Sequence, residues 1–162
     1  MADSSFDVVV ETDRQEVDNA INQASKEVGQ RYDFKGTDTS IGWSGEQIVI
    51  ASNSEERANA ALDVLQDKFV KRKLSLKTME AGEPKPAGGK TYRLEISLLE
   101  GIPTDKAKAM VKIIKAAKLK VTPAIQGDQL RISGKKKDDL QEVQTLLNDN
   151  DQGLPLKFTN YK

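Results

Sequence analysis

The side chains in this sequence that could do chemistry are cations beside aromatic rings, and they suit binding better than catalysis. Residues 31–36 read Arg-Tyr-Asp-Phe-Lys-Gly and follow a segment expected to be helical. A nucleotide needs cations or backbone N–H groups for its phosphates and flat groups for its base. Arg31 and Lys35 could contact phosphate, and Tyr32 or Phe34 could stack on a base. The alternative is that the rings fill the gap between helix and sheet while Arg31 is a solvated charge.

A second group of cations lies at the start of a predicted strand. Lys90 and Arg93 lie on either side of Tyr92 in the sequence. Tyr92 falls on the same face of the predicted strand as the apolar residues at every second position after it. Arg93 is then on the opposite face of the strand with Glu95, where a ligand or another domain could meet it. A cross-strand ion pair is an equally good interpretation of the same pattern.

A third group of cations begins the last predicted helix. Lys135, Lys136 and Lys137 stand where the exposed backbone N–H groups of a helix start would help to bind phosphate. Asp138 and Asp139 follow at once and can satisfy the same helix start. The nucleotide-binding residues predicted from the three groups are Arg31, Phe34, Lys35, Lys90, Arg93, Lys135 and Lys136.

Several function classes are excluded or disfavoured by what the sequence lacks. It contains no cysteine and no histidine, so thiolate chemistry and the commonest general base are absent. Residues 88–91 lack the first glycine of a phosphate-binding P-loop and open a strand instead of a helix. We therefore predict no enzyme, with no catalytic residues, no metal site and no cofactor. The absence of a signal peptide and of a long apolar run predicts a cytoplasmic protein with no membrane partner.

The elements that must position these residues occur twice along the 162-residue chain. Each half reads as strand-helix-strand-strand-helix-strand, which predicts an α+β fold of two ferredoxin-like (βαββαβ) sandwich domains. A shift of 82 positions maps residues 46–50 onto 128–132, residues 58, 61 and 65 onto 140, 143 and 147, and the expected closing strand 74–76 onto 156–158. The predicted domains are residues 1–80 and 90–162, with the Pro- and Gly-rich residues 81–89 as a linker.

Local signals set the expected bounds of some elements. Thr12 and Gln15 form a capping box for the first helix, and Gly29 can stop that helix. Pro103 suits the first position of a later helix, and Pro123 places its strand at a sheet edge. Charge also divides along the chain, because residues 1–89 hold 11 basic and 16 acidic side chains and residues 90–162 hold 14 and 9.

Three motifs resemble those of the YajQ family of bacterial proteins, namely residues 31–36, 89–93 and 126–141. Residues 6–9 and 155–158 fit as well, so the resemblance runs from about residue 5 to the end. It implies two ferredoxin-like domains that exchange their N-terminal strands. It also implies nucleotide binding, in some members of cyclic di-GMP, with no family-wide catalytic activity. Residues 40–45 depart most from the family, either as a hairpin tip or as an altered ligand rim.

The leading hypothesis is therefore a non-enzymatic nucleotide-binding protein. Its finer form is a cyclic di-GMP receptor that binds its ligand at the boundary between the domains and signals through their arrangement, with a protein partner such as a transcription regulator. The alternative is RNA binding on the basic half of the chain. The third strand of each half carries no aromatic residue, which weakens the base-stacking platform of an RNA-recognition module. An enzyme is the least favoured hypothesis.

Overall fold

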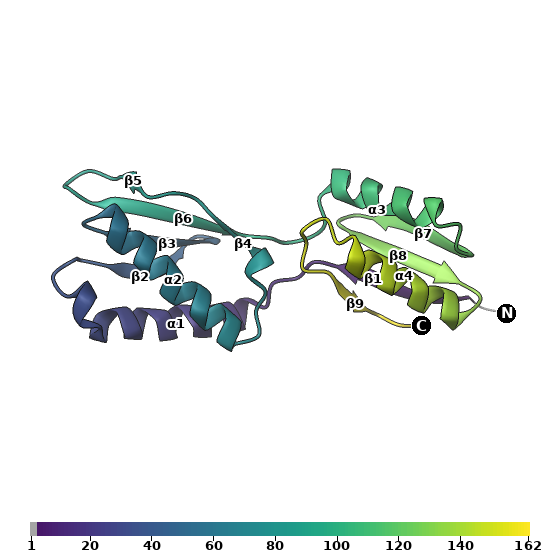
Figure 1. Ribbon diagram of the computed structural model, residues 1–162, viewed down its shortest axis with the longest axis horizontal. Helices are drawn as coiled ribbons and strands as arrows, with labels where there is room; N and C mark the ends of the chain where they lie inside the picture. Colours follow the sequence, from purple (N-terminus) through teal and green to yellow (C-terminus); the bar gives the residue numbers. More distant parts are fainter. Residues whose placement is uncertain (1–2) are drawn as a thin grey trace. The chain divides into compact units, whose positions relative to one another are not determined.

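The computed structural model describes residues 3–162, which form two compact units. One consists of Thr12–Leu99 and is called the central unit here. The other, the terminal unit, combines residues 3–11 with Glu100–Lys162. Each unit is an antiparallel sheet with two helices packed on one of its faces, as Figure 1 shows. The predicted α+β class with two ferredoxin-like sandwiches is confirmed.

The sheet of the central unit has the strand order β2-β3-β6-β4, and the short β5 also pairs with β6. Its strands are β2 (Ser40–Ser44), β3 (Gln47–Ser52), β4 (Met79–Ala81), β5 (Lys85–Pro86) and β6 (Tyr92–Leu98). Its helices are α1 (Arg14–Gln30) and α2 (Glu55–Lys71), with the 3₁₀ turns η1 (Tyr32–Phe34) and η2 (Leu76–Thr78). Both helices bury apolar stripes whose residues are spaced three and four apart, and these stripes form the core of the unit with the sheet.

The sheet of the terminal unit has the strand order β7-β8-β1-β9. Its elements are β1 (Ser4–Val9), α3 (Thr104–Ala116), β7 (Val121–Gln126), β8 (Gln129–Gly134), α4 (Lys137–Asp149) and β9 (Lys157–Thr159). Phe6 and Val8 on β1, with Leu130 and Ile132 on β8, are fully buried beneath α3 and α4. Pro123 lies on the edge strand β7, as predicted, where its missing N–H disrupts no ladder.

The strand that opens each half of the sequence pairs with strands from the other half. β1 pairs with β8 and β9, and β6 pairs with β3 and β4. Figure 1 shows the purple β1 among the green and yellow strands. The predicted ranges 1–80 and 90–162 thus follow the repeat in the sequence, whereas each packed unit takes one central strand from the other half.

The segment predicted as a linker, residues 81–89, is part of the central sheet. Ala81 pairs with Ile96, Lys85 pairs with Arg93, and the N–H of Gly82 donates to the carbonyl of Glu95 at 2.8 Å. Gly88 and Gly89 have φ of 80° and 57°, which suits the tight turn into β6. The glycines and prolines here therefore mark a hairpin and an irregular edge strand within the central unit.

Four predicted bounds also shift. α1 is capped by Asp13, whose carboxylate accepts a hydrogen bond from the N–H of Glu16 at 3.2 Å, so the cap lies one residue after Thr12. The helix continues through Gly29, which has no positive φ. The closing strand of the central sheet is β4 instead of residues 74–76, because the chain turns at Lys73 (φ 61°) after α2 ends and the 3₁₀ turn η2 precedes β4. Pro103 stands at the N-cap of α3, just before its first residue.

The packing removes most of the charge difference between the sequence halves. The terminal unit contains 12 basic and 11 acidic side chains, and the central unit contains 13 and 14. Because β1 pairs with β8 and β9, its Asp7 joins the lysine-rich C-terminal segment. Within residues 3–162, no helix is both long and apolar enough to cross a membrane.

Candidate functional site

Arg31 and Phe34 lie together at the end of α1, but carboxylates already occupy the arginine. Arg31 donates to both carboxylate oxygens of Asp33, at 3.0 and 2.7 Å, and to Glu27 at 3.2 Å. Arg57, from the first turn of α2, also reaches Asp33 at 3.3 Å. The guanidinium carbons of Arg31 and Arg57 lie 5.2 and 5.7 Å from the centre of the Phe34 ring. Asp33 therefore holds the position between two guanidinium groups that a phosphate would need.

The electrostatics of this cluster favour its own ion pairs. Hydrogen bonding to Arg31 holds the pKa of the Asp33 carboxyl below its usual range. Lys68 first and Arg31 second lower the pKa of Glu27 in the same way. Phe34 is only 4% exposed and packs in the core, so its ring has no free face for a base. Tyr32 is 87% exposed and Lys35 is exposed, yet the neighbouring arginines are neutralised.

Lys90 and Arg93 belong to the β5–β6 hairpin. Lys90 lies in the turn with φ 60°, and Arg93 extends over the open face of the central sheet, meaning the face without helices. Arg93 donates to Glu95 two residues along the same strand at 3.2 Å and to the Ser44 hydroxyl at 3.4 Å. The ion pair is thus within one strand instead of across strands. A cavity of about 660 Å³ beside Arg93 and Lys85 is lined by three carboxylates, from Glu80, Glu83 and Glu95, which outnumber its two cations and disfavour phosphate.

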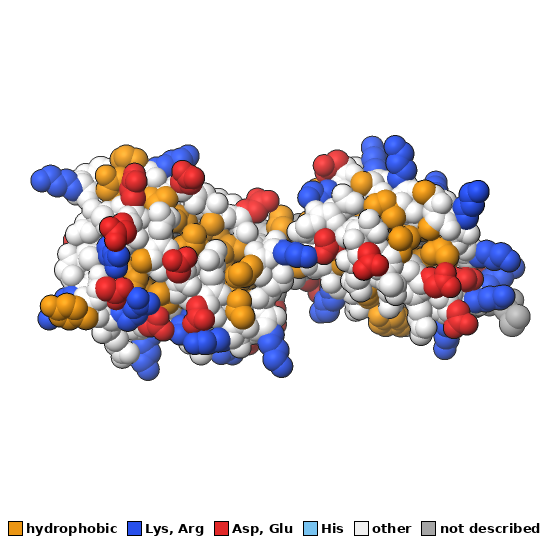
Figure 2. Space-filling view, in the orientation of Figure 1, with side chains coloured by type: hydrophobic (Ala, Val, Ile, Leu, Met, Phe, Trp, Pro, Cys, Tyr) orange, Lys and Arg blue, Asp and Glu red, His pale blue; other side chains and the backbone are white. Residues whose placement is uncertain are grey.

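Lys135 and Lys136 lie in a pocket of different character, at the corner where β8 ends and α4 begins. The pocket has a volume of about 440 Å³. Its lining residues are Asp3, Lys120, Thr122, Ser133, Gly134, Lys135, Lys136 and Asp139. Three lysines and two hydroxyl groups thus face two carboxylates, and all three lysines are exposed. Figure 2 shows Lys and Arg side chains gathered at this end of the terminal unit, with acidic ones among them.

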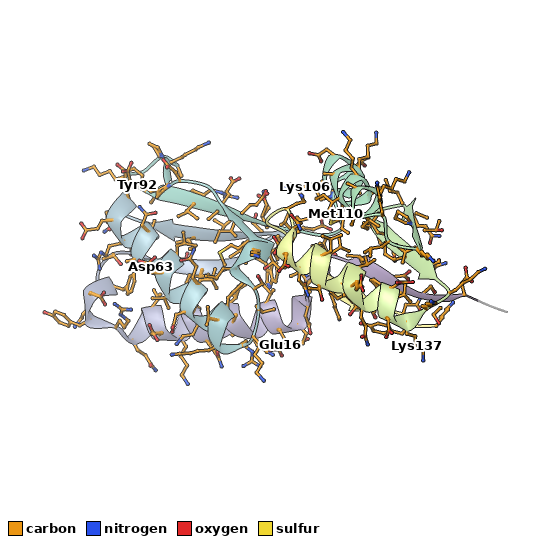
Figure 3. The ribbon with its side chains drawn as sticks, turned by 45° about the vertical axis from the view of Figure 1, so that its right-hand side comes forward. Glu16, Asp63, Tyr92, Lys106, Met110 and Lys137 are labelled. Atoms are coloured by element: carbon orange, nitrogen blue, oxygen red, sulfur yellow. The ribbon has the colours of Figure 1, made fainter. Side chains whose placement is uncertain are left out.

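The backbone of this corner adds donors for an anion. Lys136 is the N-cap residue of α4, in an extended conformation, and no side chain caps the helix there. The first N–H groups of a helix have no partner within it and carry partial positive charge. Gly134 keeps the corner compact, because a Cβ there would lie 3.2 Å from Val121 Cγ1 and 3.3 Å from the Lys120 carbonyl. Figure 3 labels Lys137 in the first turn of α4.

Sequence reasoning found two of the three lysines of this pocket and missed Lys120 and the two hydroxyl groups. Thr122 pairs directly with Ser133 across the β7–β8 hairpin. The turn at Gly127 and Asp128 was recognisable in the sequence, and counting back from that turn gives this register. Lys120 then falls beside the end of β8. The signal was therefore present in the spacing between the turn and the lysine cluster.

The described residues contain no group of three or more Asp and Glu side chains placed to hold a metal ion.

The fold defines a protein of two ferredoxin-like units, and comparisons with known proteins place it further. A model of the family described as YajQ-like nucleotide-binding proteins matches residues 4–162. A nucleotide-binding protein of Streptomyces griseus is 52% identical over 163 residues, with all of both chains covered. One from Thermobifida fusca is 54% identical over 99% of each chain, and one from a Mycobacterium strain is 52% identical over all of both chains. This chain belongs to the YajQ family, which confirms the resemblance seen in its motifs.

Proposed function

We propose that this protein binds a nucleotide without transforming it, and that the phosphates lie in the corner pocket of the terminal unit. The observation that carries the proposal is the convergence of Lys120, Lys135 and Lys136 on the uncapped start of α4. Lysine ammonium groups and helix N–H donors both commonly bind phosphate. The names of the relatives, which are nucleotide-binding proteins, support the same chemistry.

The finer form of the proposal is a receptor for cyclic di-GMP. It rests on the family resemblance, and no spacing typical of well-known sites for that ligand occurs in the sequence. A receptor would pass on binding as a change in the arrangement of its two units to a protein partner such as a transcription regulator. Small-angle scattering with and without cyclic di-GMP measures that change, and identical profiles at saturating ligand would rule the mechanism out.

RNA binding is the alternative, and the folded units favour it less than the sequence did. The terminal unit has a net charge of only +1, so the basic half of the sequence does not form a strongly basic body. No aromatic side chain of the described strands lies on an open sheet face, since Phe6, Trp43, Tyr92 and Phe158 all lie on the helix-covered faces. RNA retention that falls steeply with salt would revive this alternative.

Calorimetric titration with GTP, ATP and cyclic di-GMP tests the proposal. Lys135→Ala/Lys136→Ala should weaken binding by about tenfold or more, because a hydrogen bond to a charged group contributes about 1.5–3 kcal/mol. The matched control is Lys108→Ala/Lys112→Ala, which removes two exposed lysines from α3 in the same unit and should leave affinity unchanged. Arg31→Ala tests the other candidate location and should also have no effect. Absence of heat with all three ligands, or equal loss in variant and control, would contradict the proposal.

A further inference from the structure

A second cavity lies on the flank of α4, next to the corner pocket, and nothing described so far uses it. Its volume is about 660 Å³, and it lies between α4, the start of β1 and the segment that follows β9. The side chains that matter in its lining are Phe6, Lys137, Leu140, Gln141, Gln144 and Tyr161. With Lys162, which also lines the cavity, they combine an apolar floor, two amides and two cations, whereas the corner pocket has no aromatic or large apolar side chain.

Tyr161 is the feature of this groove that most needs an explanation. Its side chain is 64% exposed, which is unusual for a large ring that is also held in place. Its hydroxyl accepts a hydrogen bond from Gln144 Nε2 at 3.2 Å. Its ring lies 6.1 Å from the ring of Phe6 at an interplanar angle of 32°. The ring is therefore fixed from two sides while most of its surface remains open to solvent.

An irregularity in the backbone brings Tyr161 to this position. Asp7 pairs with Thr159, yet the next paired residues are Ser5 and Lys162, which exchange two backbone hydrogen bonds of 3.0 and 2.9 Å. Between these two pairs the chain advances two residues along β1 but three residues along the C-terminal segment, and this one-residue excess is a β-bulge. Asn160 is the extra residue and has φ 55°, in the left-handed region.

The bulge decides on which face of the sheet Tyr161 lies. Regular pairing would place Tyr161 opposite Ser5, on the open face, because residues alternate between faces along a strand. The extra residue moves Tyr161 to the helix-covered face, beside Phe6 and α4. Asn160 is anchored in turn, since its Nδ2 donates to the buried carboxylate of Asp7 at 2.9 Å. Bulges commonly re-aim a side chain next to a functional site.

The geometry points to this groove as the binding site for the base of the nucleotide, stacked on Tyr161. This inference rests on the proposed function, since it assigns the base of a ligand whose phosphates lie in the corner pocket. A fixed ring with an open face offers a stacking platform, and stacking accepts any base. The side-chain N–H₂ of Gln144 donates to Tyr161, so its carbonyl oxygen can accept a hydrogen bond from a donor on the base edge. The amide of Gln141 lines the same groove.

The two cavities are placed so that one ligand can span them. Lys136 lines the corner pocket and Lys137, the next residue, lines the groove. Gln144 lies eight positions after Lys136 in the sequence, which is about 12 Å along a helix axis. A nucleoside di- or triphosphate in an extended conformation covers such a span. This span favours a nucleoside polyphosphate over a cyclic dinucleotide as the ligand class, with the base in the groove and the phosphate chain in the corner pocket.

The test compares two probes that share a phosphate chain, GTP and inorganic triphosphate, by calorimetric titration of the full chain. Tyr161→Ala should weaken GTP binding about fivefold or more, since stacking of one base contributes at least that factor, and should leave triphosphate binding unchanged. Tyr161→Phe keeps the ring and should bind GTP within about twofold of the wild type, which also shows that the position tolerates substitution. Tyr32→Ala is the control, because it removes an exposed tyrosine from the other unit.

Each outcome decides between the two proposals. Unchanged GTP affinity in Tyr161→Ala overturns the assignment of the groove, while the corner pocket remains supported if Lys135→Ala/Lys136→Ala still loses affinity. Equal losses for GTP and triphosphate in Tyr161→Ala also overturn it, because a stacking platform acts on the base alone. Failure of the wild type to bind GTP overturns the assignment of the groove to the base of a nucleoside polyphosphate, whereas failure to bind GTP, ATP and cyclic di-GMP alike defeats the proposed function itself.

Discussion

Two corners at equivalent places in the repeat satisfy their polar groups in opposite ways. In the central unit, β3 leads into α2 through Ser52, Asn53 and Ser54; the hydroxyl of Ser54 caps α2 by accepting from the N–H of Arg57 at 3.1 Å. In the terminal unit, the shift of 82 positions replaces these residues by Gly134, Lys135 and Lys136, and no side chain caps α4.

The central corner is also closed by a hydroxyl network. Ser52 is 1% exposed, shares a hydrogen bond with the hydroxyl of Thr39 at 2.9 Å and donates to the carbonyl of Thr37 at 3.3 Å. Asn53 donates from its backbone to Thr37 and from its side chain to the carbonyl of Gly36, at 2.9 and 3.2 Å. The donors of this corner are therefore already used within the protein.

Under the proposed function, the duplicated corner has diverged into a structural copy, at the start of α2, and a binding copy, at the start of α4. A buried or capped donor stabilises the fold, whereas an uncapped helix start flanked by lysines is free to meet an anion. The same contrast separates Arg31, paired with carboxylates on both sides, from Lys135 and Lys136. Both regions contain cations, so the number of cations does not distinguish them. They differ in that carboxylates pair with Arg31.

The largest expected effect is on the stability of the central unit and comes from removing the ring of Phe34. Phe34→Ala deletes a fully packed side chain and should lower the free energy of unfolding of the central unit by about 3–5 kcal/mol. Trp43, the single tryptophan, lies in β2 of this unit and reports its unfolding by fluorescence in urea. Nucleotide affinity measured below the transition should stay unchanged. A loss of affinity without loss of stability would show that Phe34 acts in binding and would reverse the comparison.

Exchanging the cap residues should convert one corner toward the other. Lys136 has φ −112° and ψ 131°, and Ser54 has φ −148° and ψ 152°, so both are in the extended region that an N-cap requires. Lys136→Ser should therefore stabilise the terminal unit by about 1 kcal/mol and weaken nucleotide binding, since it fills the donors and removes a cation. Ser54→Ala should destabilise the central unit by a similar amount and leave binding unchanged.

Thermal unfolding and calorimetric titration measure both arms of this exchange. If Lys136→Ser binds nucleotide as tightly as the wild type, the helix start and its lysine are not part of the site. If Ser54→Ala alters affinity, the assignment of the central corner as purely structural is wrong.

The sequence was sufficient for what depends on local pattern. The apolar stripes, the edge position of Pro123 and the lysines at the start of α4 all follow from spacing within one element. The sequence was insufficient for contacts between residues far apart along the chain, such as strand pairings and ion pairs. Alternation shows that β1 is a strand with a buried face, but not which sheet it joins. Likewise, the sequence of residues 31–36 does not show that Arg57 and Asp33 meet across 24 positions, which neutralises the predicted site.

The bulge at Asn160 was hidden for a related reason. One extra residue moves every later side chain of the strand to the opposite face of the sheet. The extra residue can be recognised only when the pairing with the neighbouring strand is known. Tyr161 was therefore not among the predicted residues, although its exposure and position make it the strongest candidate for base stacking.

The smallest expected effect concerns the open faces of the two sheets and depends on pH. Asp7 on β1 is 5% exposed and accepts hydrogen bonds from Arg131 on β8 at 2.9 Å and from Asn160 at 2.9 Å. The hydrogen bond from Arg131 lowers the pKa of the Asp7 carboxyl most strongly. The register makes Glu95 the equivalent residue on β6, and its cross-strand neighbour is Val49, so the central sheet has no such pair.

A carboxyl whose pKa is lower in the folded than in the unfolded protein adds stability that is fully present above the unfolded pKa of about 3.9. That stability disappears as the pH falls through the folded value. Asp7→Asn should thus destabilise the terminal unit by about 1 kcal/mol at pH 7, an amount reduced because Arg131 is more than one-third exposed. Urea unfolding followed by far-UV circular dichroism should show the gap between wild type and variant narrowing below about pH 4. A gap that stayed constant down to pH 2 would mean that the carboxyl contributes by shape instead of charge, and the contrast with the Glu95 position would then have no electrostatic basis.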